Sequence, residues 1–225
     1  KCNTCGSLLA VASVTVGETP AVTYYMDIHD AFNAAAASSD STLTLLQNVT
    51  LADNTDISLY PENDDPNFVF TIDWNGKILS GNTLNLLTFS GRTSVILKDS
   101  SGNNAGGVRN NSGIAVCISL DGDAHTVTIE GGTYSPQVIK TGSGTLQIKG
   151  GVFENPANAP VRFALYAPAG KLTDLLVPGY TLTYNAAGTD LLDVYETAHT
   201  EAGRTVYVVS HTHSFNEYGE CACGY

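Results

Sequence analysis

Charged side chains are scarce in this chain of 225 residues, and basic ones are the scarcer kind. Only 14% of the residues are charged, and ten Lys and Arg face 22 Asp and Glu, which gives a formal net charge of −12. A surface this acidic repels nucleic acid and anionic lipid, so we expect no nucleic-acid partner. This excess of acidic residues is compatible with solubility outside a cell and with cation binding.

Long apolar runs are also missing. No stretch approaches the roughly 18 apolar residues that a membrane helix needs, so the sequence predicts no membrane insertion. The chain does not open with a charged segment followed by an apolar one, the pattern of a signal peptide. Residues 1–6 instead look like the tail of an earlier unit, and we expect the chain to be a piece of a larger protein.

Cysteine is rare, with five residues at positions 2, 5, 117, 221 and 223. This density is far too low for a scaffold held together by disulfides. Cys117 lies in the apolar run 114–120, where we expect a buried, inert thiol.

The residues that are plentiful are β-formers and turn-formers. Two alternating runs within residues 7–25 flank a turn at residues 17–20 and predict a β-hairpin. A single helix is expected within residues 26–39, with Asp27 as its N-cap and with apolar residues at helical spacing at Ile28, Ala31, Phe32 and Ala35.

Five short triplets within residues 40–170 have apolar outer members and a mostly polar middle one, so their outer members are expected to face inward. They are residues 43–45, 70–72, 95–97, 127–129 and 146–148. Their spacing of 19 to 32 residues is irregular, which is typical of β-helix turns rather than of a fixed repeat.

The residue after each later triplet alternates in charge, which supports stacking. In a parallel stack Asp73, Lys98, Glu130 and Lys149 would lie about 4.8 Å apart on the outer face. This order places acid next to base and avoids like-charge neighbours.

A second sheet is expected from runs downstream of the triplets, at residues 57–59, 84–89, 114–120, 137–140 and 163–166. Pairs of glycines at 106–107, 131–132 and 150–151 would form the corners. The rival fold, a β-sandwich, would favour regular short hairpins. We predict an all-β fold, a right-handed parallel β-helix over residues 40–170. An N-terminal hairpin and capping helix (7–39), a β-rich C-terminal cap (171–210) and a small Cys/His knuckle (211–225) would complete it.

Residues 127–135 (VTIEGGTYS), 146–154 (LQIKGGVFE) and 30–51 carry a resemblance. They resemble the pectin-lyase-like β-helix modules of Gram-positive bacterial surface and secreted multi-module proteins, over roughly residues 22–155. The ending HTHSFNEYGECACGY resembles the short His/Cys repeats between such modules. The resemblance implies an extracellular or cell-wall-associated setting and no particular activity. Host or bacterial glycans, surface proteins and neighbouring modules of the same chain are the partners that it suggests.

The C-terminal residues carry the strongest ligand pattern. His211 and His213 on an extended segment, followed by Cys221 and Cys223, could complete a tetrahedral zinc site. Four protein ligands leave no open position, so this zinc would be structural. Two alternatives stay open: a loose polar tail, or a four-cysteine site or disulfides with Cys2 and Cys5.

Other candidate sites are weaker. Two acidic loops, residues 53–65 and 121–123, could bind calcium, but a solvated loop is the favoured interpretation. A lyase would need a cationic base beside carboxylates, and the candidates are sparse: Lys140, Arg109, Arg162 and the pair Asp121 and Asp123. No hydrolase, metalloprotease or P-loop motif is present in the sequence. The sequence therefore favours a non-catalytic module.

Glycan binding would use exposed aromatic faces, and Trp74 and Tyr60 are the candidate ligand-binding residues, with Trp74 expected at an exposed corner. We weigh two hypotheses: a structural or adhesive module, and a carbohydrate-binding or carbohydrate-active β-helix of the lyase or hydrolase kind. Plain Thr, Ser and Asn on the lateral faces favour the first, and a continuous aromatic and polar groove favours the second.

Overall fold

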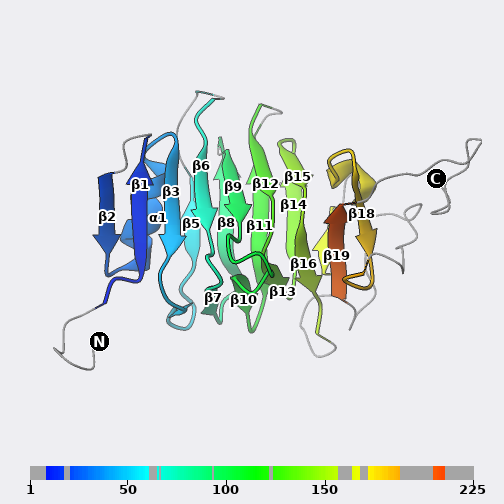
Figure 1. Ribbon diagram of the computed structural model, residues 1–225, viewed down its shortest axis with the longest axis horizontal. Helices are drawn as coiled ribbons and strands as arrows, with labels where there is room; N and C mark the ends of the chain where they lie inside the picture. Colours follow the sequence, from blue (N-terminus) through cyan, green and yellow to red (C-terminus); the bar gives the residue numbers. More distant parts are fainter. Residues whose placement is uncertain are drawn as a thin grey trace, which may run out of the picture.

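The computed structural model describes residues 9–17, 21–60, 65, 67–92, 94–121, 124–156, 164–167, 172–187 and 205–210. The chain is mostly β-strand, with one short α-helix and a parallel β-solenoid of about four turns. Three sheets run along the length of the molecule, with the first strands at one end and the last strands at the other (Figure 1).

Sheet A contains the predicted triplets. Its order is β15-β12-β9-β6-β3-β1-β2, and all pairs from β3 to β15 are parallel. The strands are β1 (Ala12–Val16), β2 (Ala21–Tyr25), β3 (Ser41–Leu45), β6 (Phe70–Asp73), β9 (Val95–Lys98), β12 (Thr126–Ile129) and β15 (Thr145–Ile148).

Sheet C contains the predicted second runs, in the order β17-β14-β11-β8-β5, all parallel. Its strands are β5 (Ile57–Leu59), β8 (Asn85–Gly91), β11 (Ile114–Leu120), β14 (Val138–Gly142) and β17 (Leu165–Tyr166).

The sequence predicted no third sheet, although the last two strands of sheet B lie in the predicted β-rich segment 171–210. The order of sheet B is β18-β19-β16-β13-β10-β7-β4, with strands β4 (Val49–Thr50), β7 (Ile78–Gly81), β10 (Gly107–Asn110), β13 (Thr133–Ser135), β16 (Gly151–Glu154), β18 (Tyr180–Thr183) and β19 (Thr205–Ser210). The last two strands pair antiparallel with each other, and β19 pairs antiparallel with β16. A 3₁₀ helix, η1 (Leu172–Leu175), leads to an isolated parallel bridge between Leu176 and Ile148 of β15.

The core consists of columns of buried side chains in which neighbours in register belong to successive turns. Sheet A contributes Leu43, Ile72, Leu97, Ile129 and Ile148, and all five are fully buried. Each aliphatic side chain buried in this way stabilises the fold by about 1.5–3 kcal/mol.

The register of the triplets is confirmed from the second one onward, since residues 70, 95, 127 and 146 pair with one another in that order. The first triplet is wrong by two residues, because Leu43 and not Leu45 pairs with Ile72. The error keeps the same face inward, as a shift of two residues must in a strand.

The alternating charges also pair as expected. Lys98 Nζ lies 4.0 Å from Asp73 Oδ2, and Lys149 Nζ lies 3.2 Å from Glu130 Oε1. Both lysines are partly exposed, so these ion pairs contribute little stability. They do keep like charges from facing each other along the stack.

The predicted hairpin and helix are both present. Strands β1 and β2 pair antiparallel, and β1 also pairs antiparallel with β3. The helix α1 (Ile28–Ala36) begins after Asp27, whose carboxylate accepts hydrogen bonds from the N–H groups of His29 and Asp30. Its apolar side, including the fully buried Phe32, joins the core.

Asparagine side chains connect successive turns at the corners. Asn48 Oδ1 accepts from the Ile78 N–H, Asn75 Nδ2 donates to the Leu45 carbonyl, and Asn104 Oδ1 accepts from the Gly132 N–H. Asn110 is the most completely bonded of them and is 4% exposed. Its side chain bonds both the N–H and the carbonyl of Thr83, the Ser112 N–H and the Ile114 carbonyl.

The predicted corner glycines lead into sheet B. Gly107, Gly132 and Gly151 all have positive φ values. At Gly107, with φ of +150°, a Cβ atom would lie 2.0 Å from the Thr133 carbonyl oxygen on the next turn. Only glycine allows two turns to approach this closely.

Candidate functional site

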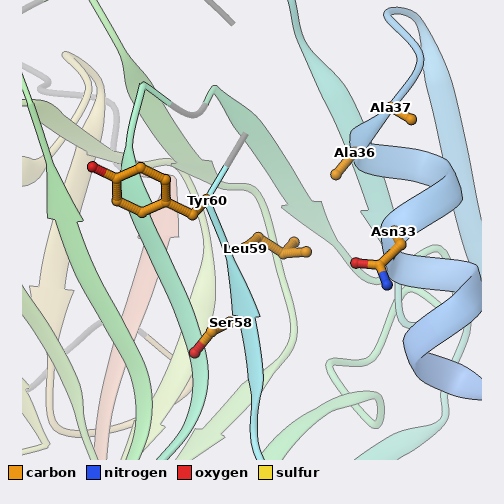
Figure 2. Close-up of a pocket in the computed structure, with 6 residues that line it drawn as sticks. All are labelled: Asn33, Ala36, Ala37, Ser58, Leu59 and Tyr60. Carbon is orange, nitrogen blue, oxygen red and sulfur yellow. The ribbon is translucent and has the colours of Figure 1, made fainter. Parts of the chain in front are cut away.

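A shallow pocket lies where α1 meets the first strand of sheet C. It has a volume of about 200 Å³ and is lined by Asn33, Ala36, Ala37, Ser58, Leu59 and Tyr60. In Figure 2, Leu59 points toward α1 and Asn33 points back toward β5, while Ser58 and Tyr60 point away from the helix. The pocket is therefore formed by one turn of helix and the first edge of a sheet.

Tyr60, one of the two candidate ligand-binding residues, is the exposed aromatic residue at this pocket. It follows β5 directly and is 62% exposed. Its ring rests against Gly91, where a Cβ atom would come within 3.0 Å of the ring carbon Cζ. The glycine thus gives the ring a fixed place on the surface of sheet C.

The chemistry of the pocket suits a small neutral molecule with hydroxyl groups. The Asn33 amide can both donate and accept, while the Ser58 hydroxyl donates to Asp56 Oδ2 at 2.5 Å. This nearby carboxylate disfavours anions. A volume of about 200 Å³ lies below the roughly 300–1,000 Å³ of typical ligand pockets, so it fits no more than one sugar-sized ring.

The outer face of sheet C extends from this pocket as rows of uncharged side chains. One row, in register, is Ser58, Thr88, Cys117, Ile139 and Tyr166. A second contains Ser90, Ser119 and Thr141. These rows are plain hydroxyl and apolar groups rather than a continuous aromatic groove.

Cys117 belongs to the outer row and is not part of the core. It is partly exposed, so the expectation of a fully buried thiol is wrong. The reason is the strand alternation, which turns Val116 and Ile118 inward and Cys117 outward. Partial burial raises the pKa of the Cys117 thiol, so it stays protonated and unreactive at neutral pH.

Trp74 is fully buried, and the expectation that it is exposed at a corner is wrong. Its indole Nε1 donates to the Tyr134 hydroxyl at 3.1 Å, and that hydroxyl donates to the Gly131 carbonyl at 2.9 Å. The rings of Trp74 and Tyr134 meet edge-on with centroids 6.4 Å apart, and Tyr134 stacks on Phe153 at 5.6 Å. Burial raises the pKa of Tyr134, so its hydroxyl remains a donor. Trp74 cannot present a ring face to a glycan.

The basic residues considered for a lyase lie on different sheets. Arg109 in β10 of sheet B lies 3.7 Å from Glu154 of β16, whereas Lys140 in β14 of sheet C donates to the Gly142 carbonyl at 2.9 Å. Arg162 and Asp123 lie outside the described residues. The arrangement does not bring Arg109 and Lys140 together beside shared carboxylates.

The described acidic residues of the candidate calcium loop are engaged locally. Asp53 accepts from Asn82, Asp56 from Ser58, and Asp65 from Asn67. No group of three or more His, Cys, Asp or Glu that could hold a metal occurs among the residues that the structure describes. The predicted zinc ligands His211, His213, Cys221 and Cys223 lie outside those residues, as do Cys2, Cys5, Glu62, Asp64 and Asp123.

One polar cluster was missed by the sequence reasoning, at the corner between sheets A and B. Asp99 accepts four hydrogen bonds, from the N–H groups of Gly76, Ser101 and Gly106 and from the Ser101 hydroxyl, at 2.7–3.2 Å. Burial alone would raise its pKa, but the bonds from Gly106, Ser101 and Gly76 outweigh it, and the pKa of Asp99 falls below 3.8. Because Gly76 lies on the previous turn, the carboxylate links two turns.

Acid should weaken the protein through Asp99. A group whose pKa is lower in the folded state stabilises the fold fully above its unfolded pKa, near 3.8, and loses this contribution as pH falls through the folded value. We expect the urea midpoint to fall below pH 3.8 more steeply for the wild type than for Asp99→Asn, which has no charge to lose. Denaturation followed from neutral pH to about pH 2 measures this. Parallel curves for the two proteins would contradict the assignment.

Comparison with known proteins found no matching family model, no similar curated protein and no similar solved structure. Within the described ranges, no helix is long and apolar enough to cross a membrane. A fold supports many activities, so the function of this chain has to be inferred from its surfaces.

Proposed function

We propose that this chain is a non-catalytic structural or adhesive module that acts outside the cell. The outer surface of the solenoid supports this proposal. Its rows carry uncharged side chains, mostly hydroxyl-bearing or β-branched, such as Thr42, Thr71, Ile96 and Gln147 in sheet A. Among the described residues, the ion pairs Lys98–Asp73, Lys149–Glu130 and Arg109–Glu154 each join residues of different turns.

The proposed extracellular location is inferred from the sequence. The resemblance to β-helix modules of Gram-positive surface and secreted proteins suggests a cell-wall-associated or secreted parent protein with neighbouring modules. We propose that α1 and the β1–β2 hairpin cap the first turn of the solenoid, and that His211, His213, Cys221 and Cys223 hold a structural zinc after the last turn. Stacked turns of this kind would space or present other domains.

A second candidate function, glycan binding, is favoured by one observation. Tyr60 presents an exposed ring beside a pocket with the Asn33 amide and the Ser58 hydroxyl. Aromatic rings with adjacent hydrogen-bonding groups suit the apolar face and the hydroxyls of a sugar. Such a site would make the module an adhesin for neutral glycans.

A polysaccharide panel tests both functions. We expect no new reducing ends or unsaturated products from neutral or acidic polysaccharides, with or without added calcium, and turnover of any of them would refute the non-catalytic proposal. If the module binds glycans, retention on an array should be lost in Tyr60→Ala and kept in Tyr60→Phe, which preserves the ring. Leu84→Ala is the control, because Leu84 is 77% exposed and does not line the pocket. Glycan binding that is equal in all variants would exclude the Tyr60 site.

A further inference from the structure

The first edge of sheet A is open among the described residues. Strand β2 pairs with β1 on one side and with no described strand on the other. Four of its five residues are exposed and the fifth, Tyr25, is partly exposed. At the other end, the isolated bridge to Leu176 lies beside β15, and the antiparallel strands β19 and β18 follow β16 (Figure 1).

This edge is also the most apolar surface that the structure describes. Of the eight large apolar side chains exposed in the described part of the chain, five lie on or beside β1 and β2: Leu9, Val16, Val22, Tyr24 and Met26. Exposed edges are normally protected by lysine, proline or a bulge. Strand β2, with the sequence AVTYY, has neither lysine nor proline.

Charge does not oppose a second copy at this edge. The chain carries a net charge of −12, so two copies repel each other over most of their surface. Residues 9–17 and 21–26 contain no charged side chain. Two copies can therefore pair along β2 without like charges within the paired strands, although Glu18 and Asp27 lie just beyond them in the sequence.

The residue order of β2 makes the edge self-complementary. When two identical strands pair antiparallel about a two-fold axis through the central Thr23, Val22 of each lies opposite Tyr24 of the other. Val22 and Tyr24 face the same side of the strand, paired with Thr15 and Ser13 of β1. Pairs of a β-branched and an aromatic residue are favourable across antiparallel strands. The same operation also places Ala21 opposite Tyr25.

We propose that the chain self-associates through β2, which pairs antiparallel with β2 of a second copy about a two-fold axis at Thr23. The pairing joins two seven-stranded sheets into one continuous sheet. The interface is isologous, as in most symmetric dimers, so it closes and does not propagate into a fibre. It holds two solenoids end to end, with their C-terminal ends facing away from each other.

Charge reversal at the two-fold axis tests this arrangement. Thr23→Lys and Thr23→Glu each place like charges directly opposite one another, and we expect each variant alone to dimerise ~tenfold more weakly than the wild type. An equimolar mixture of the two variants should recover dimers, because lysine then faces glutamate. Thr88→Lys, on the outer face of sheet C, is the control and should dimerise like the wild type. Sedimentation equilibrium of the 225-residue chain from about 1 μM to about 1 mM measures these constants.

Three outcomes would overturn the proposal. A wild type that stays monomeric over this range would mean that β2 does not recruit a second copy. Dimers that persist unchanged in both Thr23 variants would place the contact elsewhere. A mixture that stays monomeric, although both variants show the circular dichroism and thermal midpoint of the wild type, would exclude pairing at Thr23.

Discussion

Replacing Gly107 with alanine will destabilise the protein by more than about 3 kcal/mol, or prevent folding altogether. The new Cβ atom would lie 2.0 Å from the Thr133 carbonyl oxygen, 2.7 Å from its nitrogen and 2.8 Å from its carbonyl carbon. These are backbone atoms of a strand that pairs with β10 through Gly107 itself. This clash can be removed only if two turns of the solenoid move apart, which also disturbs the core columns beneath them.

Gly102 provides the matched control for this substitution. It also has a positive φ, of +78°, but no atom lies within 4 Å of the Cβ position. Gly102→Ala should therefore lower the free energy of unfolding only by the cost of a left-handed conformation, about 1–2 kcal/mol. Urea denaturation followed by circular dichroism compares the two free energies of unfolding. Equal losses would mean that backbone conformation, and not the spacing between turns, determines the need for glycine at Gly107.

Removing the side chain of Asn110 should have the second large effect, with Asn110→Ala costing about 4 kcal/mol. The side chain is buried and makes four hydrogen bonds to backbone groups, two of them to Thr83 on the preceding turn. Alanine cannot replace any of these bonds. Each buried group without a partner adds its own desolvation cost.

The adjacent Asn111 is the control, because it is exposed and its backbone N–H, which the substitution keeps, bonds the Gly81 carbonyl. Asn111→Ala should change the free energy of unfolding by no more than about 0.5 kcal/mol. The measurement is the urea midpoint with its slope, since a constant slope shows that only stability has changed. A loss below about 1 kcal/mol for Asn110→Ala would show that the corner is not held by this side chain.

The features that depend on alternation were predictable from the sequence. The triplets, the alternating charges at Asp73, Lys98, Glu130 and Lys149, and the hairpin all follow from side chains that point to opposite faces of a strand. The same rule also places Trp74 inward, two residues after the buried Ile72, and Cys117 outward between two buried neighbours. Both errors arose because residue type was given more weight than position in the strand.

Sheet B and the polar corners were harder to predict. Strands β4 and β13 have only two and three residues, which is too short for a periodic signal, and the glycines before β10 and β13 look like turns. The bond from Gly76 to Asp99 joins residues 23 positions apart and the bond from Asn110 to Thr83 joins residues 27 apart, and a single sequence does not reveal such long-range partners. Tyr60 could be found from its type and place after a strand. Asn33 could not, because it joins the pocket only through the docking of α1.

The direction of the backbone hydrogen bonds has a consequence for a protein under mechanical load. In sheets A, B and C these bonds connect one turn to the next, so they lie along the length of the solenoid. Tension applied between its two ends pulls along the bonds and loads the turns in series. Turns can then detach one at a time, each releasing its own 19 to 32 residues of chain. A module built this way would lengthen in steps under tension and limit the force passed to whatever it is attached to.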